Sequence, residues 1–382
     1  MKIAILKERR ADEKRCAATP DTVKKYIALG ATVAVEAGAG ESAAIADSAF
    51  VAAGATIVVD AATAVADAEL ILKVQRPLTT ADGGSDELAS ARKGALLAAI
   101  LNPHGAKESL GDYAAKGVDA FAMELMPRIT RAQSMDVLSS QSNLAGYKAV
   151  LDAAAVFGRA FPMMMTAAGT IAPARVLVMG AGVAGLQAIA TARRLGAIVS
   201  ATDVRPAAKE QVESLGATFV AVEDEEFKQA ETAGGYAKEM SDAYKAKQAA
   251  LIAETIKKQD IIITTALIPG RKAPVLVSED MVKSMKLGSV IVDLAVEQGG
   301  NCPLSEAGKV VVKHGVSIVG HNNVPSRLAV DATALYARNL LNFVTLLIDK
   351  ETKALKVNWE DDIIKGVALT RDGAIIHPAF KA

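Results

Sequence analysis

The segment 175–185, with the sequence RVLVMGAGVAG, constrains the fold of this 382-residue chain most strongly. Its apolar run 176–179 predicts a fully buried strand, which leads directly into the pattern G-x-G-x-x-G at 180–185. A helix-forming stretch follows, and a second apolar run then ends on Asp203. This order of strand, glycine turn, helix, strand and acid indicates a dinucleotide-binding site. The alternative is a glycine turn between ordinary elements.

Each residue of the glycine turn has a physical reason. Gly180 permits a tight turn, Gly182 lets backbone amides approach a pyrophosphate, and Gly185 lets helix and strand pack closely. The pyrophosphate would lie at the positive end of the helix, beside Val183 and Ala184 of the first turn.

The ends of two predicted strands supply the remaining nucleotide contacts. Asp203 can accept hydrogen bonds from a ribose diol and would repel a 2′-phosphate, which favours NAD(H). Val204 and Arg205 follow it, and Arg205 could accommodate such a phosphate, so NADP(H) stays an alternative. Ala266 and Leu267 end another strand, where a ribose would lie.

Composition narrows the class of protein. The 43 basic and 43 acidic residues give no net charge, which argues against a nucleic-acid partner. Hydrophobic residues make up 51% with few aromatics, as suits parallel strands buried on both faces. The two distant cysteines, Cys16 and Cys302, suggest a reducing compartment. The sequence shows no signal-peptide pattern, no long apolar span and no metal-ligand spacing of histidines, so we expect a soluble chain without a metal.

A short unit, glycine followed by a β-branched run, recurs along the chain. It marks the joint between a helix and a strand in a doubly wound sheet, and it occurs at 29–32, 53–56, 195–198 and 215–218. Further strands are predicted at 2–6, 70–74, 97–101, 118–123, 260–264, 289–293 and 316–319.

We therefore predict an α/β protein with two Rossmann-like domains, each a doubly wound parallel sheet. The first spans 1–145 and is completed by 328–382, where a helix over 331–349 returns to it. The nucleotide-binding domain spans 146–327. The ligand is expected in the cleft between the domains, at the carboxyl ends of the nucleotide-domain strands.

Two segments depart from the regular pattern. The acidic stretch 223–244 is either a lid, with Tyr236 closing over the nucleotide, or a solvated surface loop. The apolar stretch 161–173, FPMMMTAAGTIAP, is either a hairpin exchanged with a second subunit or a piece of the core.

Several motifs together resemble one superfamily along nearly the whole chain. They are KERRADEKRCAATP at 7–20, AGAGE at 37–41, LKV at 72–74, the glycine fingerprint, AP at 273–274 and VDLAVEQGG at 292–300. The chain is similar in these motifs to alanine dehydrogenases and to nicotinamide nucleotide transhydrogenases.

Resemblance to alanine dehydrogenase implies an arginine and a lysine that hold the substrate, a histidine acid/base and an aspartate. Arg15 and Asp293 match two of these positions. Gln75 stands at the lysine position, and Asn102 stands at the histidine position, with His104 two residues further on. Glutamine and asparagine do not titrate near neutral pH, so the match disfavours this activity.

Resemblance to transhydrogenase implies hydride exchange between two nicotinamides, which needs close contact of the rings and no acid/base group. The stretch 128–139 resembles the family's arginine–glutamine–aspartate loop. By this resemblance Gln133 approaches the partner-side ring, while Arg128, Asp136 and Ser139 position the carboxamide and riboses. The alternative is a surface ion pair between Arg128 and Asp136.

The same resemblance implies the partners. The chain would bind NAD(H) as a homodimer and work as a Si/Re-specific, proton-translocating enzyme with an NADP(H)-binding subunit and a membrane-spanning subunit. Because the sequence ends without a membrane span or a second fingerprint, we expect a separate cytoplasmic subunit, peripheral to the inner membrane through its partners. A non-catalytic NAD-sensing module remains a third hypothesis.

Overall fold

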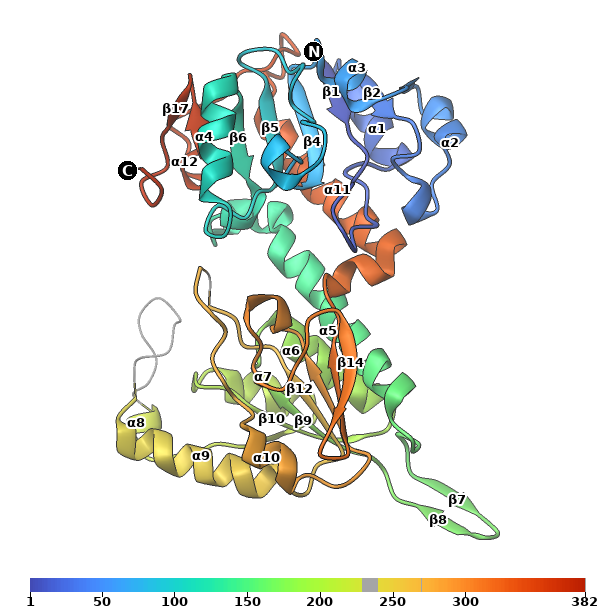
Figure 1. Ribbon diagram of the computed structural model, residues 1–382, viewed down its shortest axis with the longest axis vertical. Coiled ribbons are helices and arrows are strands. Elements are labelled where there is room, and N and C mark those ends of the chain that lie inside the picture. Colours follow the sequence, from blue (N-terminus) through green and yellow to red (C-terminus); the bar gives the residue numbers. More distant parts are fainter. Residues whose placement is uncertain (229–239, 269, 382) are drawn as a thin grey trace. The chain divides into compact units, whose positions relative to one another are not determined.

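The computed structural model describes residues 1–228, 240–268 and 270–381, and the chain divides into two compact units (Figure 1). Unit 1 comprises Met1–Gln141 and Pro325–Ala382, and unit 2 comprises Ser142–Val324. Both are α/β structures built on a mostly parallel sheet, which confirms the predicted fold class.

The sheet of unit 1 has six strands in the order β3-β2-β1-β4-β5-β6. Every neighbouring pair is parallel, and the order reverses between β1 and β4, as in a doubly wound sheet. The strands are β1 (Lys2–Ile5), β2 (Thr32–Glu36), β3 (Thr56–Val58), β4 (Leu70–Gln75), β5 (Leu96–Ile100) and β6 (Asp119–Ala122).

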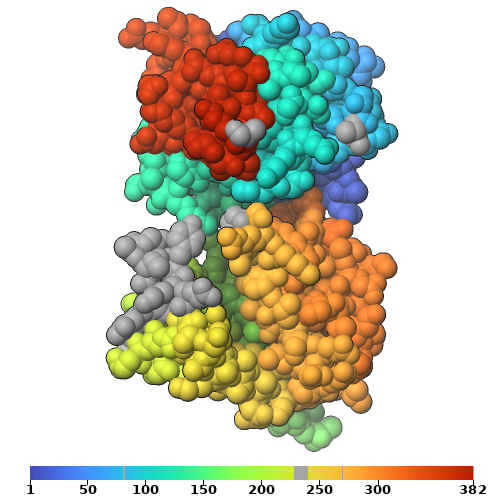
Figure 2. All heavy atoms as spheres, turned by 60° about the vertical axis from the view of Figure 1, so that its left-hand side comes forward, coloured from blue at the N-terminus to red at the C-terminus, as the bar shows by residue number. Residues whose placement is uncertain are grey.

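Helices cover this sheet and bring the two sequence segments of unit 1 together. The main helices are α1 (Pro20–Ala28), α2 (Asp47–Ala52), α3 (Ala61–Val65), α4 (Lys107–Lys116), α11 (Ala329–Leu346) and α12 (Asp362–Val367). The small hairpin of β16 (Thr370–Arg371) and β17 (Ala374–Ile375) packs near α4, and Figure 2 shows these red C-terminal residues against the blue-green surface of unit 1. Short 3-10 helices lie at η1 (Glu41–Ala43), η2 (Thr80–Asp82), η3 (Met123–Leu125) and η4 (Thr130–Met135).

Helix α11 is central to the core of unit 1. Its side chains Tyr336, Leu340 and Phe343 are fully buried among residues of the sheet. The helix ends three residues before the predicted limit of 349, because Asp349 instead accepts backbone hydrogen bonds from residues 351 and 352 and forms a turn.

The sheet of unit 2 has seven strands in the order β11-β10-β9-β12-β13-β15-β14. All pairs are parallel except β14 with β15. The strands are β9 (Arg175–Met179), β10 (Ile198–Thr202), β11 (Thr218–Phe219), β12 (Ile261–Thr264), β13 (Val290–Asp293), β14 (Lys309–Lys313) and β15 (Val316–Gly320). The sequence analysis missed β14, whose signal is the His314-Gly315 turn with both φ angles positive.

Helices cover both faces of this sheet. They are the C-terminal half of α5 (Val137–Val156), then α6 (Val183–Arg194), α7 (Ala208–Ser214), α8 (Glu225–Lys228), α9 (Asp242–Ile256), α10 (Glu279–Ser284) and the 3-10 turn η5 (Val296–Gln298). Along β9, Val176 and Val178 enter one core cluster while Leu177 and Met179 enter the other. This alternation explains why the whole run is apolar.

The recurring glycine units form helix–strand joints in both sheets. Gly30, Gly54, Gly196 and Gly216 all have φ between +75° and +97°, and they precede β2, β3, β10 and β11. Glycine is favoured there because other residues adopt this left-handed backbone at a cost.

The apolar segment 161–173 forms a hairpin of β7 (Met164–Thr166) and β8 (Gly169–Ile171) that projects from unit 2 (Figure 1). Residues 162–172 are exposed, with Met165 at 78%, while Phe161 is buried. The alternative that this segment belongs to the core of the chain is therefore wrong for 162–172.

The segment 223–244 is described only at its ends, by α8 and the start of α9. Tyr236, predicted to close over the nucleotide, lies outside the described residues. In the described ranges, no helix combines the length and the apolar character needed to cross a membrane.

Candidate functional site

The glycine turn of unit 2 is held by close backbone packing. Gly180 follows β9 with φ +106°, and a Cβ placed there would lie 2.5 Å from Thr265 Oγ1. A Cβ on Gly185 would lie 1.8 Å from the carbonyl oxygen of Gly180. Neither position can hold a larger side chain without moving backbone, so both glycines are required by the local fold.

Gly182 differs from these two positions. It is the N-cap of α6, and a Cβ on it would meet no atom within 4 Å. Val183 and Ala184 begin the helix behind it, and no side chain caps this end. The backbone here is open to solvent at the positive end of a helix, an arrangement that can receive a phosphate.

Asp203 lies just beyond β10 and is linked to the same turn. Its carboxylate accepts the Ala181 amide at 2.7 Å and the Arg205 amide at 2.9 Å. The Arg205 guanidinium also pairs with it, with Nε at 2.9 Å, while Val204 between them is exposed. In this structure the two residues that could recognise the ribose or its 2′-phosphate thus contact each other.

The loop after β12 is fixed by a side chain that the sequence analysis missed. Asn301 donates to the Ala266 carbonyl at 2.9 Å and accepts the Ala266 amide at 3.1 Å. Asn301 is fully buried, whereas the neighbouring Leu267 is exposed. Its signal in the sequence is its place directly after the diglycine of the 292–300 motif.

Asp293 is the buried centre of that motif. It has no exposed surface, and its two oxygens accept five hydrogen bonds. The lone-pair positions of the carboxylate are thereby filled by fixed donors, so it organises the loop. The donors are the Thr264 and Ser305 hydroxyls and the amides of Ala295, Asn301 and Cys302.

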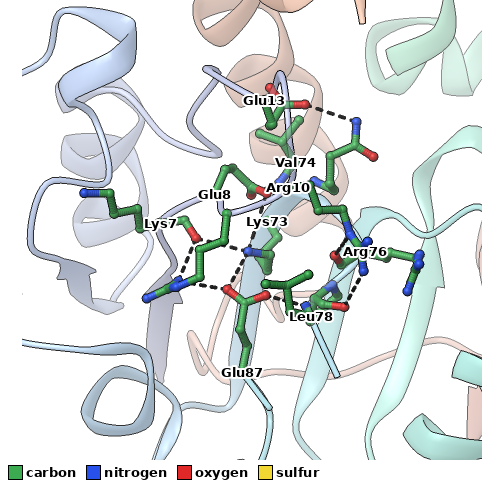
Figure 3. Close-up of polar contacts among 12 residues, drawn as sticks. Lys7, Glu8, Arg10, Glu13, Lys73, Val74, Arg76, Leu78 and Glu87 are labelled. Atoms are coloured by element: carbon green, nitrogen blue, oxygen red, sulfur yellow. Dashed lines mark hydrogen bonds and ion pairs between the residues drawn. The ribbon is translucent and has the colours of Figure 1, made fainter. Parts of the chain in front are cut away.

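Unit 1 contains a buried cluster of charges (Figure 3). Lys73, 1% exposed, places Nζ 3.0 Å from Glu87 and 3.4 Å from Glu8, and it donates to the Lys7 carbonyl. Glu8 also accepts the Val74 amide at 2.6 Å. Burial raises the pKa of Glu8, while Lys73 opposes the shift.

Two of the positions compared with alanine dehydrogenase meet at Glu13. Arg15 binds Glu13 through two nitrogens, at 2.8 and 2.6 Å, and donates to Gln141 at 2.8 Å. Gln75 Nε2 donates to Glu13 at 3.1 Å, as Figure 3 shows. The position compared with a substrate lysine is therefore held by a neutral amide bonded within the cluster.

Asn102 and His104 follow β5. Asn102 has φ +49°, and its amide donates to the Glu124 carboxyl, as does the Leu101 amide at 2.9 Å. His104 packs edge-on against Phe380, with ring centroids 4.9 Å apart. Burial raises the pKa of Glu124 to about 7.

The stretch 128–139 forms η4 and the start of α5. Asp136 accepts the Ser139 amide at 2.9 Å and the Ser139 hydroxyl at 2.6 Å, which caps the helix. Arg128 is exposed, and within the described ranges it forms no ion pair. The alternative of an Arg128–Asp136 ion pair is wrong, since Arg131 rather than Arg128 pairs, with Asp361.

The structure places the predicted site residues in two groups. Unit 1 holds Arg128, Gln133, Asp136 and Ser139, with Gln133 exposed on η4. Unit 2 holds the nucleotide group, which is Gly180, Gly182, Val183, Ala184, Gly185, Asp203, Val204, Arg205, Ala266 and Leu267.

The open glycine turn, the helix behind it and the acid after the second strand define a nucleotide-binding α/β protein of the Rossmann type. Residues 4–145 match the family described as alanine dehydrogenase/PNT, N-terminal domain, and residues 149–378 match its C-terminal domain. The chain belongs to the alanine dehydrogenase/PNT family, as the sequence motifs predicted.

Transhydrogenase relatives are similar over the full chain. The first portion of NAD(P) transhydrogenase subunit alpha from Rhodospirillum rubrum is 62% identical, covering 100% of this chain and 99% of the relative. The protein of the same name from Rickettsia prowazekii is 48% identical, covering 99% and 96%. The crystal structure of transhydrogenase from Sinorhizobium meliloti is 54% identical with a TM-score of 0.89, covering 98% and 100%.

Alanine dehydrogenases are more distant. The enzyme of Halomonas elongata is 32% identical, covering 99% of this chain and 95% of the relative. A solved L-alanine dehydrogenase is 26% identical with a TM-score of 0.82, covering 100% and 98%. The sequence prediction that transhydrogenase is the nearer branch is confirmed.

Two glycine variants should separate folding from nucleotide binding. Gly182→Ala fits open space, so we expect an unchanged melting temperature but at least tenfold weaker NADH binding by titration. Gly185→Ala collides with the Gly180 carbonyl, so it should lower the melting temperature as well. Equal NADH affinity in Gly182→Ala and the wild type would contradict a pyrophosphate site here.

Glu124 should give unit 1 a pH-dependent stability. Because the pKa of Glu124 is raised from 4.5 to about 7 on folding, the folded state binds its proton more tightly than the unfolded chain. This stability is present below about pH 4.5 and is lost as pH rises through 7, by about 3 kcal/mol at most. Urea unfolding from pH 5 to 8 should show a flatter profile for Glu124→Gln; parallel profiles would contradict it.

Proposed function

We propose that this chain is the NAD(H)-binding subunit of a proton-translocating NAD(P) transhydrogenase. It passes a hydride between NADH and NADP⁺ bound on a partner subunit, as a Si/Re-specific enzyme, and a membrane-spanning partner couples this transfer to proton movement. The observation that carries the proposal is the 62% identity, over the full chain, to the alpha subunit portion from Rhodospirillum rubrum.

The composition of the site in unit 1 supports hydride exchange over amino-acid oxidation. Alanine oxidation requires groups that move protons, whereas exchange between two nicotinamides requires positioning and the exclusion of water. Gln75 and Asn102 are amides that do not titrate near neutral pH, and Gln75 is bonded to Glu13. These neutral amides favour the transfer reaction.

The nicotinamide end of NADH would be handled by the 128–139 stretch. In this proposal Gln133 approaches the partner-side ring, and Arg128, Asp136 and Ser139 position the carboxamide and riboses. The exposure of Arg128 and Gln133 supports a contact with molecules outside unit 1. Asp136 is held in place by its cap on α5.

The rest of NADH would lie on unit 2. The open surface of Gly182 at the start of α6 would take the pyrophosphate, and Asp203 would take the adenosine ribose after exchanging some of its contact with Arg205. Tyr236 would close over the bound nucleotide. This arrangement favours NAD(H) on this chain and leaves NADP(H) to the partner.

The assembly would be a homodimer at the cytoplasmic side of the inner membrane, attached through its partners. The exposed hairpin β7–β8 supports the dimer, because Met163, Met164, Met165 and Ile171 form a run of exposed large apolar side chains on it. A second copy of the chain would cover this surface.

The purified chain should bind NADH and show little dehydrogenase turnover by itself. Adding a purified NADP(H)-binding transhydrogenase subunit should give hydride transfer from NADH to an NADP⁺ analogue, followed by absorbance. NADH-dependent amination of pyruvate at enzyme-like rates would instead establish alanine dehydrogenase, and tight NADH binding with no transfer to any acceptor would establish a sensing module.

Gln133→Asn shortens the proposed contact by one methylene. We expect it to reduce the hydride-transfer rate constant at least tenfold while NADH affinity changes less than threefold, because the side chain would act on ring alignment. Stopped-flow transfer and fluorescence titration measure the two quantities. Equal changes in rate and affinity, or none, would contradict this role.

A charge on the hairpin should break the dimer. Met165→Asp should convert the protein to a monomer in light-scattering chromatography, because the charge would be buried at the interface. Val59→Asp in unit 1 is the matched control, since Val59 and Met165 are both 78% exposed. A dimer that survives Met165→Asp would argue against this interface.

A further inference from the structure

Two asparagines of α11 hold the turn that carries Gln133. Asn339 and Asn342 are three residues apart and so lie on one side of the helix. Both amide nitrogens donate to the carbonyl oxygen of Ser134, at 2.8 and 3.0 Å. Ser134 directly follows Gln133 in η4, and all of these residues belong to unit 1. The peptide next to Gln133 is thus anchored to a core helix.

Asn339 is the more constrained of the two. It is 8% exposed, and its Oδ1 accepts the Ser140 hydroxyl at 2.7 Å while its nitrogen faces Ser134. A carbonyl oxygen can only accept a hydrogen bond, so only one orientation of the amide satisfies both neighbours. Asn342 lies nearer the surface and adds a second donor.

The contact continues into the buried polar cluster of unit 1. Gln141 donates to the Ser140 hydroxyl at 3.3 Å and to the Ala332 carbonyl at 3.1 Å. Its oxygen accepts from Arg15 at 2.8 Å. An unbroken series of hydrogen bonds therefore joins Arg15 to the Ser134 peptide, and each member restricts the rotation of the next.

We propose that Asn339 is a positioning residue for hydride transfer, which fixes the Ser134 peptide and through it the Gln133 side chain. The inference rests on the proposed function, in which Gln133 faces the partner-side ring. A misplacement of about 1 Å at a reacting centre can cost roughly 100-fold in rate. Asn339 itself contacts no nucleotide in this proposal, so its loss affects transfer more than binding.

Asn339→Asp tests this with almost no change in shape. It keeps an acceptor for Ser140 but turns an acceptor toward the Ser134 carbonyl, so the anchoring bond is lost. At saturating NADH, with the NADP(H)-binding subunit present, we expect single-turnover transfer to fall at least tenfold. The Kd for NADH should change less than threefold.

Two substitutions on the same helix provide the comparison. Asn342→Asp removes the outer donor and should reduce transfer threefold at most. Thr345→Val removes a hydroxyl that bonds only within the helix, to Leu341, and should leave the rate unchanged. The order of the three effects separates the anchor from general damage to α11.

A second measurement keeps the inference testable if Asn339→Asp unfolds. Ser140→Ala removes the hydroxyl that orients the Asn339 amide, and it should reduce transfer about threefold with NADH affinity retained. Hydrogen exchange at 130–136 should accelerate in both variants, with exchange elsewhere in unit 1 unchanged.

The two levels of the proposal fail in different ways. Absence of transfer by the wild-type chain with its partner would overturn the proposed function. Wild-type transfer that is undiminished in folded Asn339→Asp, or in Ser140→Ala, would overturn the positioning role alone. Parallel losses of rate and of NADH affinity would also overturn it.

Discussion

The contact between Gly185 and the Gly180 carbonyl sets the geometry of unit 2, because it fixes how α6 starts behind β9. The neighbouring strand ends are then tied to this turn in sequence. Thr265 Oγ1 donates to the Gly180 carbonyl at 3.1 Å, and Asn301 holds the adjacent Ala266 through both of its backbone groups. The Asn301 amide in turn donates to Asp293. The carboxyl ends of β9, β12 and β13 are thus one hydrogen-bonded structure, with an open helix terminus at its side.

Unit 1 is organised on a different principle. Its central strand β4 places Lys73 between Glu8 and Glu87, so the core next to the sheet is ionic. Removing one partner of such a buried pair typically costs roughly 3–5 kcal/mol, because the remaining charge is left without compensation. The loop 7–15 is therefore held by pairing, and Glu13 passes this constraint to Arg15 and onward to Gln141. Fixed polar groups of this kind suit a site that orients a cofactor and moves no protons.

The sequence predicted the sheets, the helix–strand joints and the glycine turn because each depends on local rules. Glycine at a positive φ, apolar runs and a helix end are all readable within a few residues. The contacts of Asn301 and Asn339 were not predictable, because both depend on segments that are remote in sequence. Asn339 meets Ser134 across 205 residues, and no spacing rule links them. The Arg205–Asp203 pair was missed for another reason: the sequence shows both residues but not that they contact each other.

Figure 3 also shows why Lys73 has a second significance. Its ammonium group is buried among carboxylates while most lysines of the chain reach solvent, so amine-labelling reagents will modify it only when the surrounding strands separate. Unit 1 therefore contains its own chemical reporter of opening. Labelling at this one nitrogen counts excursions from the folded state that spectroscopy, averaging over the whole chain, does not resolve.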